Sequence, residues 1–336
     1  EFDWAAIVTP SLELNATAAA LRDALDNHSS PAAFADAMTT YLHSWPLWLD
    51  GRHGDDIADN PDLIAFQEAV GISPNAETTN TQFWNAGAAS CERGCGSNPL
   101  DSYGIPDPHS YKSQLARGTV LANPLLRVSG GTEQAIADLY AIHSQYRLFQ
   151  ATGTADTECH PLPYEALYER LQDAFASGQP NQAISDADIS SADDQNAMYV
   201  QLIAALQAQG ALDDGWNYLP RLNVINRLMY ANIDSIQGWN RVRRSIGFHG
   251  WDRSTATVFS NRQDRLMVLL SWAAQRNLVP YFRMWGYEID HAEARQISDW
   301  GFPTIEPVFY AIPPTGHCTS LEYDELPVDG VSTWPQ

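Results

Sequence analysis

The residues of this 336-residue chain that most readily do chemistry are its four cysteines and nine histidines. Cys91 and Cys95 lie close together in a glycine- and serine-containing segment, and Cys159 and Cys318 stand alone in loop-like surroundings. An even number of cysteines with such flanks favours disulfides over a role in the core. Four cysteines allow three pairings. We expect Cys91 to pair with Cys95, and Cys159 with Cys318.

A zinc site is the alternative use of two of these cysteines. Cys91 and Cys95 could combine with His109 and His160, because zinc accepts thiolate and imidazole ligands. No CxxC pair is present, and such pairs are typical of structural zinc sites. The disulfide interpretation is therefore preferred, and the zinc interpretation stays open.

Other catalytic patterns give little signal. No GxSxG segment is present, so the nucleophile turn of a serine hydrolase is not indicated. Paired carboxylates of the glycosidase kind cannot be recognised from spacing alone. The acidic pairs Asp193-Asp194 and Asp213-Asp214 are more typical of helix caps and solvated turns.

Several stretches, taken in order, resemble the enhancin-like zinc metallopeptidases (the M-sixty gluzincins), especially their branch of secreted bacterial O-glycopeptidases and mucinases. The resemblance covers roughly residues 90–312, and its order along the chain makes it moderately specific. The stretches are Gly94-Cys-Gly-Ser-Asn-Pro-Leu-Asp-Ser-Tyr103, Asp138-Leu-Tyr-Ala-Ile-His-Ser-Gln-Tyr-Arg147, Gln209-Gly-Ala-Leu-Asp-Asp-Gly-Trp216, Ser271-Trp-Ala-Ala-Gln-Arg-Asn-Leu-Val-Pro-Tyr-Phe-Arg-Met-Trp-Gly286 and Gly301-Phe-Pro303.

The resemblance implies a zinc site that this sequence does not complete. In the family, HExxH places two histidines on one helix face to bind zinc, and its glutamate acts as general base. This chain contains no HExxH. At the expected place Ser113 and Arg117 replace the histidines, and Gln114 replaces the general base. Downstream, either Glu133 or Gln134 falls where the third zinc ligand would be.

These replacements do not support the family's mechanism. A serine hydroxyl is a poor zinc ligand, arginine stays protonated, and glutamine cannot accept a proton from water. Arg117 could instead take the place of the metal and pair with Glu133 as a buried cation. A site rebuilt from His109, His143 and Glu133 is the alternative. We therefore expect a vestigial site with no cofactor, and zinc only if the site is rebuilt.

Aromatic residues near the vestigial site are candidates for ligand binding. The chain has 11 tryptophans, and exposed aromatic rings stack on sugar faces while arginine binds hydroxyls. Burial in the core is the more common role of such residues. The resemblance nevertheless implies that some of them line a glycopeptide cleft: Trp84, Tyr103, Tyr111, Tyr140, Tyr146 and Arg147.

Helices must position these residues, and apolar residues at helical spacing predict them. The core of the C-terminal half is predicted as three helices, over 195–209 with Asp193 and Asp194 at its N-cap, from 219 to about 239, and over 261–277. Further helices are predicted over 18–26, 32–48, 61–70, within 113–150, over 163–177 and over 292–300.

The two ends of the chain have different characters. Residues 1–70 look helical, with Trp45 and Trp48 in a buried corner, or else forming an aromatic platform for a ligand, and Pro46 ending or kinking its helix. Residues 303–336 are rich in proline, which predicts an extended tail that packs on the surface or leads to a further domain.

These elements predict a mainly α fold. We expect a gluzincin-like helical peptidase domain with a helical C-terminal subdomain and at most a small β element, near residues 100–130. The predicted domains are an N-terminal helical region, a degenerate peptidase-like active-site region, the C-terminal helical subdomain and an extended tail, over residues 1–89, 90–192, 193–312 and 313–336.

Composition limits the partners. The formal net charge is -22 and Lys112 is the only lysine, so nothing here would neutralise the phosphates of a nucleic acid. No run of eighteen apolar residues exists, and no transmembrane segment is expected. The acidic surface and the disulfides indicate a secreted or cell-surface protein.

The sequence thus leads to three hypotheses. The first is a secreted, catalytically inactive homologue of a zinc O-glycopeptidase that binds a glycoprotein, a glycan or another extracellular protein. The second is an active zinc peptidase that acts on O-glycosylated proteins through non-standard ligands. The third is a structural subunit of an extracellular assembly.

Overall fold

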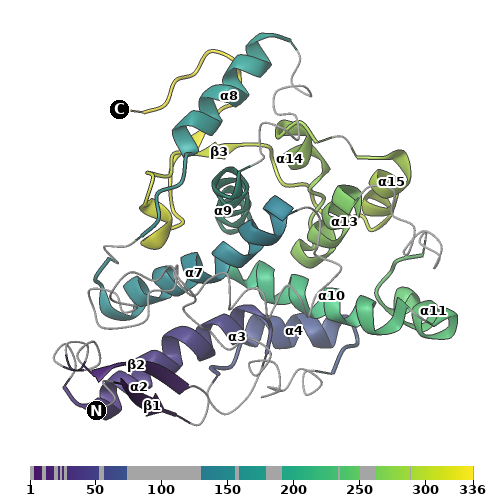
Figure 1. Ribbon diagram of the computed structural model, residues 1–336. Coiled ribbons are helices and arrows are strands. Elements are labelled where there is room, and N and C mark those ends of the chain that lie inside the picture. Colours follow the sequence, from purple (N-terminus) through teal and green to yellow (C-terminus); the bar gives the residue numbers. More distant parts are fainter. Residues whose placement is uncertain are drawn as a thin grey trace.

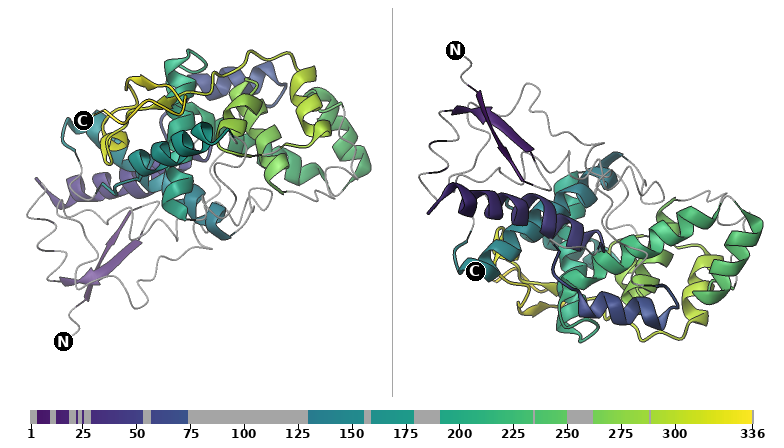
Figure 2. Two further views of the ribbon diagram at one scale, coloured as in Figure 1. Left: turned by 90° about the horizontal axis from the view of Figure 1, so that it is seen from above. Right: turned by 90° about the horizontal axis from the view of Figure 1, so that it is seen from below.

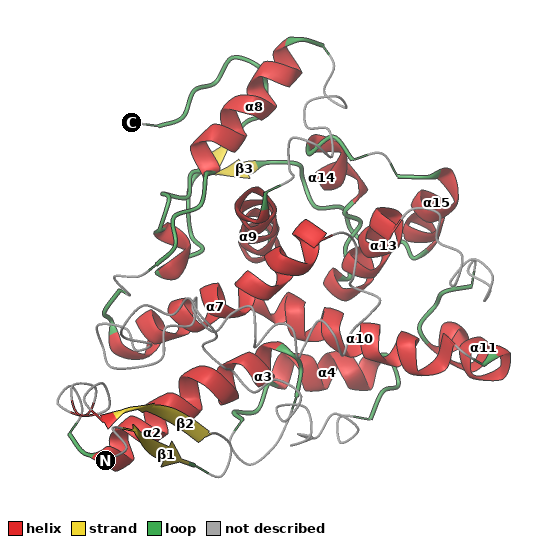
Figure 3. Cartoon of the chain, viewed as in Figure 1, coloured by secondary structure: helices red, strands yellow, loops and turns green. Residues whose placement is uncertain are grey.

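The computed structural model describes residues 4–9, 13–18, 22, 25, 29–52, 57–73, 130–155, 159–178, 191–233, 235–249, 262–287 and 289–335. Over these residues the protein is mainly helical, as the sequence predicted, and strands are few and short (Figure 1, Figure 3). The predicted β element near residues 100–130 lies outside the described residues.

The named elements in chain order are β1 (Trp4–Val8), β2 (Glu13–Thr17), α2 (Pro31–Thr39), the π-helix η1 (Thr40–Ser44), α3 (Trp45–Leu49), α4 (Pro61–Ala69), α7 (Gly130–Thr152), α8 (Tyr164–Ala176), α9 (Ala192–Ala208), the 3-10 helix η5 (Gly215–Asn217), α10 (Tyr218–Ile233), α11 (Ile236–Ser245), α13 (Arg262–Ala274), α14 (Val279–Met284), α15 (His291–Asp299), β3 (Phe309–Tyr310), the 3-10 helix η6 (Gly316–Cys318) and β4 (Glu325–Leu326).

The chain opens with a β-hairpin, and the helical prediction for residues 1–70 is wrong there. β1 and β2 pair antiparallel, with Trp4 opposite Thr17 and Val8 opposite Glu13. Hydrogen bonds between the two strands satisfy the backbone N–H and carbonyl groups here. The spacing of apolar residues along the sequence did not indicate this pairing. Figure 2 shows the hairpin beside α2 and apart from the main helical body. The predicted helix over 18–26 lies mostly outside the described residues.

The second predicted helix runs from α2 through η1 to α3 without a break, so Pro46 neither ends nor interrupts it. Proline has no N–H, and it leaves one helical acceptor without its donor. The backbone widens to a π-helix just before Pro46, where the Trp45 N–H donates to the Thr40 carbonyl. A single π turn inside an α-helix is the usual form of this adjustment.

Helix α9 lies at the centre of the core, as predicted. Every residue from Gln195 to Leu206 is buried, and a helix buried on all sides belongs inside a domain. Its N-cap, however, is Ser191, whose hydroxyl accepts from the Asp194 N–H at 3.0 Å. Asp193 and Asp194 instead lie in the first turn, where negative charge suits the helix dipole.

The next predicted core helix is two helices, α10 and α11. The break lies at Ser235, whose extended backbone and side chain cap a new helix by accepting from the Gly238 N–H at 3.1 Å. Apolar residues keep their helical spacing across this corner, so the break between α10 and α11 could not be predicted from the sequence. The helices predicted over 61–70, 163–177, 261–277 and 292–300 are confirmed within a few residues as α4, α8, α13 and α15.

The C-terminal tail belongs to the core, and the expectation that it packs on the surface is wrong for its first part. Phe309, Tyr310 and Ile312 are fully buried. Gln201 in α9 holds this segment with both atoms of its amide: its Nε2 donates to the Tyr310 carbonyl at 2.9 Å, and its Oε1 accepts from the Tyr310 N–H at 2.8 Å. The Gln201 amide thus pairs with the Tyr310 backbone as an adjacent strand would.

Two more glutamines hold the tail in the same way. Gln209 pairs with both backbone groups of Glu306, at 2.8 and 3.1 Å. The Oε1 of Gln172 in α8 accepts from the N–H groups of Asp329 and Gly330, at 3.0 and 2.6 Å. Beyond the short pairing of β3 with β4, the glutamine amides thereby satisfy backbone groups of the tail, which explains how a proline-rich segment becomes well fixed.

The disulfide joins the tail to the middle of the chain. Cys159 and Cys318 are bonded, with their Cα atoms 6.3 Å apart, which is the pairing that we preferred from the sequence. Cys91 and Cys95 lie outside the described residues. One hydrophobic cluster runs from Leu47 in α3 to Leu321 in the tail. No helix among the described residues is long and apolar enough to cross a membrane.

Candidate functional site

The predicted site residues fall into two groups. Tyr140, Tyr146 and Arg147 lie on the central helix α7, whose first turns also contain Glu133 and Gln134. Apart from Cys159 and Cys318, which form the disulfide, the other predicted residues lie outside the described residues and stay predictions: Trp84, Cys91, Cys95, Tyr103, His109, Tyr111, Ser113, Gln114 and Arg117.

The predicted site residues on α7 differ in how deeply they are buried. Residues three and four apart on a helix share a face, so Tyr140, His143 and Arg147 follow one another along α7. Tyr140 and His143 are 2% and 0% exposed, whereas Tyr146 and Arg147 are half-buried. Only the later part of this face reaches solvent.

Tyr140 belongs to a buried polar cluster. Its hydroxyl lies 3.4 Å from Oδ1 of Asp50 and accepts from the Asn223 amide at 3.0 Å. Oδ2 of Asp50 accepts from Arg52 at 2.9 Å and lies 3.1 Å from Arg227 Nη1. These contacts join the end of α3 to α7 and α10, so Tyr140 acts as a core residue here.

The solvent-facing end of α7 carries the feature that we call the α7 aromatic cluster, formed by Trp48, His143, Tyr146, Arg147 and Trp216. The His143 ring stacks on Trp48, with centroids 5.3 Å apart and planes 6° apart. Its other side meets Trp216 at 5.2 Å, and Tyr146 packs against Trp216 at 6.0 Å. The Arg147 guanidinium lies 5.2 Å from the Trp48 ring, a cation–π distance.

Burial sets the charge of this cluster. It lowers the pKa of His143 well below its ordinary value, and the Arg147 charge lowers it further. The imidazole is therefore neutral at pH 7. Burial, followed by the negative charge of Asp214, raises the pKa of Tyr146 to about 12, so its hydroxyl stays protonated. Arg147 is left as the cation of the cluster.

An acidic residue lies beside this cation. Asp214 caps η5 by accepting from the Trp216 N–H at 2.9 Å. Burial raises the pKa of Asp214, whereas the hydrogen bond from Trp216 and the charge of Arg147 lower it. The expectation that Asp213 and Asp214 form a cap or turn is thus confirmed for Asp214. Guanidinium, phenol and carboxylate side by side offer both donors and acceptors to a polar ligand.

An ion pair lies near Asp214. Asp62 at the start of α4 binds Arg221 of α10 through both carboxylate oxygens, and Arg221 lies 4.9 Å from the Phe66 ring. Repulsion between Asp62 and Asp214 contributes to the raised pKa of Asp214. The surface beside the α7 aromatic cluster therefore carries side chains of both charges.

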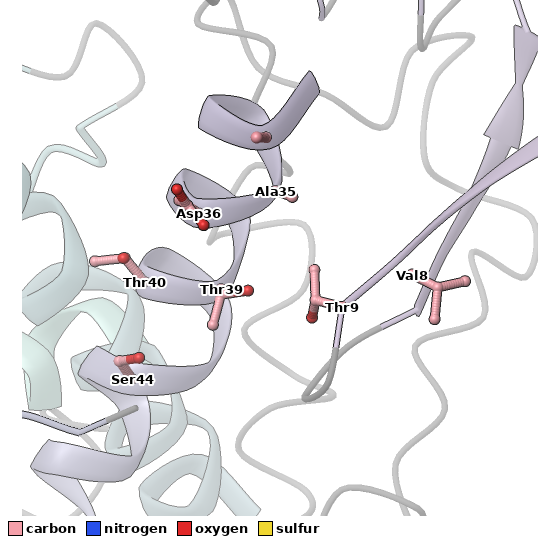
Figure 4. Close-up of a pocket in the computed structure, with 8 residues that line it drawn as sticks. Val8, Thr9, Ala35, Asp36, Thr39, Thr40 and Ser44 are labelled. Atoms are coloured by element: carbon pink, nitrogen blue, oxygen red, sulfur yellow. The ribbon is translucent and has the colours of Figure 1, made fainter. Parts of the chain in front are cut away.

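A different hollow, of about 540 Å³, lies between the end of β1 and the α2–η1 helix. Figure 4 shows Thr9 facing this helix at Thr39, with Thr40 on the same turn as Thr39 and Asp36 on the turn before. Its described lining contains hydroxyl groups and one carboxylate, and these residues include no histidine, cysteine or aromatic ring. Among the described residues, Tyr140, Tyr146 and Arg147 do not line it, and the lining side chains supply no nucleophile–base pair.

The arrangement of helices is similar to that of a solved metallopeptidase. The solved IMPa metallopeptidase from Pseudomonas aeruginosa covers 100% of this chain with a TM-score of 0.71 at 19% identity. Its complex with T-antigen gives 0.70, and a structure of IMPa with an O-glycopeptide gives 0.67 over 94% of this chain. This chain covers 39%, 39% and 37% of those three chains.

The sequence comparison names the same relative. The immunomodulating metalloprotease of Pseudomonas aeruginosa is 22% identical over 354 residues, which include 99% of this chain. The chain spans 37% of the length of that relative. No family model matches the chain. The predicted resemblance to metallopeptidases of this type is confirmed as homology and as fold, over the whole chain and not only residues 90–312.

The metallopeptidase relatives imply zinc, and the histidine spacing of this chain does not fit their HExxH motif. The expectation that Ser113, Gln114 and Arg117 stand in place of that motif falls outside the described residues and stays a prediction. No two of the nine histidines are four positions apart, so no helix of this chain can offer the paired imidazoles. Among the described residues, His143 is enclosed by aromatic rings and His160 binds Asp193 at 3.0 Å.

Sequence reasoning missed how the α7 aromatic cluster is assembled. Trp48 is 7% exposed, which confirms the buried corner, and Trp216 is fully buried. They approach His143 from α3 and η5, which lie far apart in the sequence. Spacing along α7 signals that His143 shares a face with Arg147, but no local signal identifies the two tryptophans as its partners.

Proposed function

We propose that this chain is a secreted, non-hydrolytic relative of the IMPa metallopeptidase that binds O-glycosylated protein. This proposal rests on which zinc-binding residues the sequence contains. A chain that aligns with a metalloprotease over 99% of its length contains no HExxH and no histidine pair at a spacing of four. Zinc-dependent hydrolysis needs both ligands and a base that can accept a proton.

The ligand class is taken from the relative and from the chemistry of helix α7. Solved structures of IMPa contain T-antigen or an O-glycopeptide, which are properties of that protein. In this chain, Tyr146 and Arg147 offer a protonated hydroxyl and a guanidinium at the surface of a packed aromatic group. Sugar hydroxyls are matched by such donors, and a sugar face could stack on the partly exposed ring of Tyr146. We place the binding surface at this end of α7.

The first test is metal content and hydrolysis. The full chain, purified without chelators and then incubated with zinc, is expected to hold no stoichiometric zinc. It should leave a mucin-type O-glycopeptide intact, as followed by mass spectrometry. One tightly bound zinc together with cleavage would overturn the non-hydrolytic proposal and establish an active peptidase whose ligands are not the aligned residues.

The second test is glycan binding with matched variants. Calorimetric titration with a T-antigen glycopeptide should show binding that Arg147→Ala weakens by about 10-fold or more, because hydrogen bonds to charged groups are worth about 1.5–3 kcal/mol. Tyr146→Phe removes one hydroxyl and should weaken binding less. Arg295→Ala removes an exposed arginine from the separate helix α15 and should leave the affinity unchanged.

Either of two results would reject the proposed surface. Wild-type protein without measurable glycan affinity would remove the ligand class and leave the structural-subunit hypothesis. Equal weakening by Arg147→Ala and Arg295→Ala would place binding elsewhere on the molecule. Circular dichroism of each variant separates loss of binding from loss of fold.

A further inference from the structure

A second cluster of chemically active residues lies where the tail meets the start of α8, apart from the α7 aromatic cluster. Cys159, His317 and Cys318 bring two sulfurs and an imidazole nitrogen within 4.8 Å of one another. Among the described residues this is the group with the composition and spacing of a metal site. Thiolate and imidazole are the ligands that zinc prefers. The disulfide between the two cysteines now occupies both sulfurs.

His317 is oriented toward the sulfurs by a buried neighbour. Its Nδ1 lies 3.0 Å from the Tyr164 hydroxyl, and its Nε2 lies 3.8 Å from Sγ of Cys159. Both His317 and Tyr164 are almost completely buried. When Nδ1 carries the proton and donates it to Tyr164, the lone pair of Nε2 faces Cys159. A hydrogen bond to the second ring nitrogen is the usual support of a histidine that binds metal.

The three groups stay together without the S–S bond. Beside Cys159, the Leu162 N–H donates to the Pro314 carbonyl at 2.8 Å. Beside Cys318, the Gln150 amide donates to the Thr319 carbonyl at 3.0 Å. The glutamine contacts of Gln201, Gln209 and Gln172 hold the rest of the tail independently of the disulfide. We therefore expect reduction to free two thiols while these contacts keep Cys159, His317 and Cys318 in place.

We propose that Cys159, His317 and Cys318 form a site for one zinc ion when their disulfide is reduced. Cys318 is 1% exposed and Cys159 is partly exposed, so a reductant and a metal ion enter from the Cys159 side. The complex of Zn²⁺ with two thiolates and a neutral imidazole carries no net charge, which suits a buried position. A fourth position is left for water or for the side-chain oxygen of Gln145, which lies 3.5 Å from Sγ of Cys318.

The chemical step balances with a dithiol as the reductant. Its thiolate attacks Sγ of Cys159, forms a mixed disulfide and releases Cys318 as the leaving thiolate. The second thiol of the reductant then attacks its own sulfur in the mixed disulfide, and Cys159 leaves. The reductant is oxidised to a disulfide, two electrons pass to the protein, and both cysteines become thiols. Zinc binding then releases two protons to solvent.

Cobalt titration of the full chain tests the proposal, because Co²⁺ in a thiolate site absorbs strongly. Cys91→Ser with Cys95→Ser removes the other cysteines, and dithiol reduction followed by anaerobic removal of the reductant prepares the protein. About one cobalt per chain with sulfur-to-metal charge-transfer absorption is expected, and zinc should displace it. The oxidised protein should bind none. Loss of helical circular dichroism on reduction, or no cobalt uptake, would overturn the proposal.

Variants separate this site from incidental binding. His317→Ala should abolish the cobalt spectrum, and His317→Gln, which keeps more of the volume, should do the same. Tyr164→Phe should weaken binding by about 10-fold, the effect of losing a partner of the metal-binding imidazole. His160→Ala removes a nearby histidine that pairs with Asp193 and should change nothing. Unaltered binding in both His317 variants would refute the assignment.

Discussion

Asp50 offers the sharpest test of how α3 is fixed against α7 and α10. The residue is 1% exposed, and its Oδ2 accepts from Arg52 at 2.9 Å and lies 3.1 Å from Arg227. Asp50→Ala removes both contacts and, at the same time, the contact of the carboxylate with the Tyr140 hydroxyl. Two guanidinium groups are then left without their carboxylate at the end of α3.

The expected loss of stability follows from these contacts. Breaking a buried ion pair by removing one partner costs about 3–5 kcal/mol. The side chains of Arg52 and Arg227 keep 14% and 13% exposure, so water reaches them in part and the lower end applies. We expect Asp50→Ala to lower the free energy of unfolding by about 3 kcal/mol. Asp50→Asn keeps an acceptor and should cost less.

Guanidinium denaturation at pH 7, followed by far-UV circular dichroism, measures the change. The matched control is Asp213→Ala, which removes the same charge from an exposed position and should change stability by less than about 0.5 kcal/mol. A loss below about 1 kcal/mol for Asp50→Ala would refute the reasoning, because the cluster would then not carry the helix junction. A large loss for Asp213→Ala would show that net charge, not the cluster, is responsible.

Three further predictions concern single residues. Gln201→Leu leaves the buried Tyr310 N–H without its acceptor, whereas the Tyr310 carbonyl still accepts from the Ile312 N–H, and it should cost about 1–3 kcal/mol, with faster proteolysis of the tail. Gly51→Ala should cost about 1–3 kcal/mol, since φ is +73° and the new Cβ would lie 2.8 Å from the Pro220 carbonyl oxygen. Burial lowers the pKa of His143 below its ordinary 6.5, so the unfolded chain binds this proton more readily and stability falls as the pH drops below that value. His143→Phe should therefore flatten the decline of stability in acid.

Each of these has a control in the chain. Gln237→Ala removes an exposed amide from α11 and should have little effect, so an equal loss there would contradict the role of Gln201. Gly71→Ala has nearly the same φ of +72° but nothing within 4 Å, and it isolates the backbone cost from the clash at Gly51. Identical acid profiles for wild type and His143→Phe would show that this imidazole is not the group that titrates.

Helices with local signals were predictable. Asn60 followed by Pro61 marked the start of α4, and the structure shows the Asn60 side chain accepting from the Leu63 N–H at 3.0 Å. The core helices α9 and α13 were visible because their apolar residues repeat at helical spacing. The corner at Ser235 was not, since the same spacing continues through it.

The candidate site was only partly predictable. The resemblance pointed to Tyr140, Tyr146 and Arg147 on one helix, and their depth could not be inferred from it. Burial separates the core residue Tyr140 from the other two, and burial depends on which helices pack against α7. The approach of Trp48 and Trp216 to His143 is a contact between distant segments, which no local pattern encodes.

The sequence by itself determined the mainly helical class, the acidic charge and the lack of paired histidines, because composition and spacing are properties of the chain alone. Only the tertiary structure decided which extended segments are buried and which polar groups are paired. The tail shows the reason: its prolines indicate extended backbone, but the amides that make burial possible belong to Gln172, Gln201 and Gln209 on other helices. A backbone N–H or carbonyl group can be buried at low cost only where a hydrogen-bond partner such as one of these amides is present.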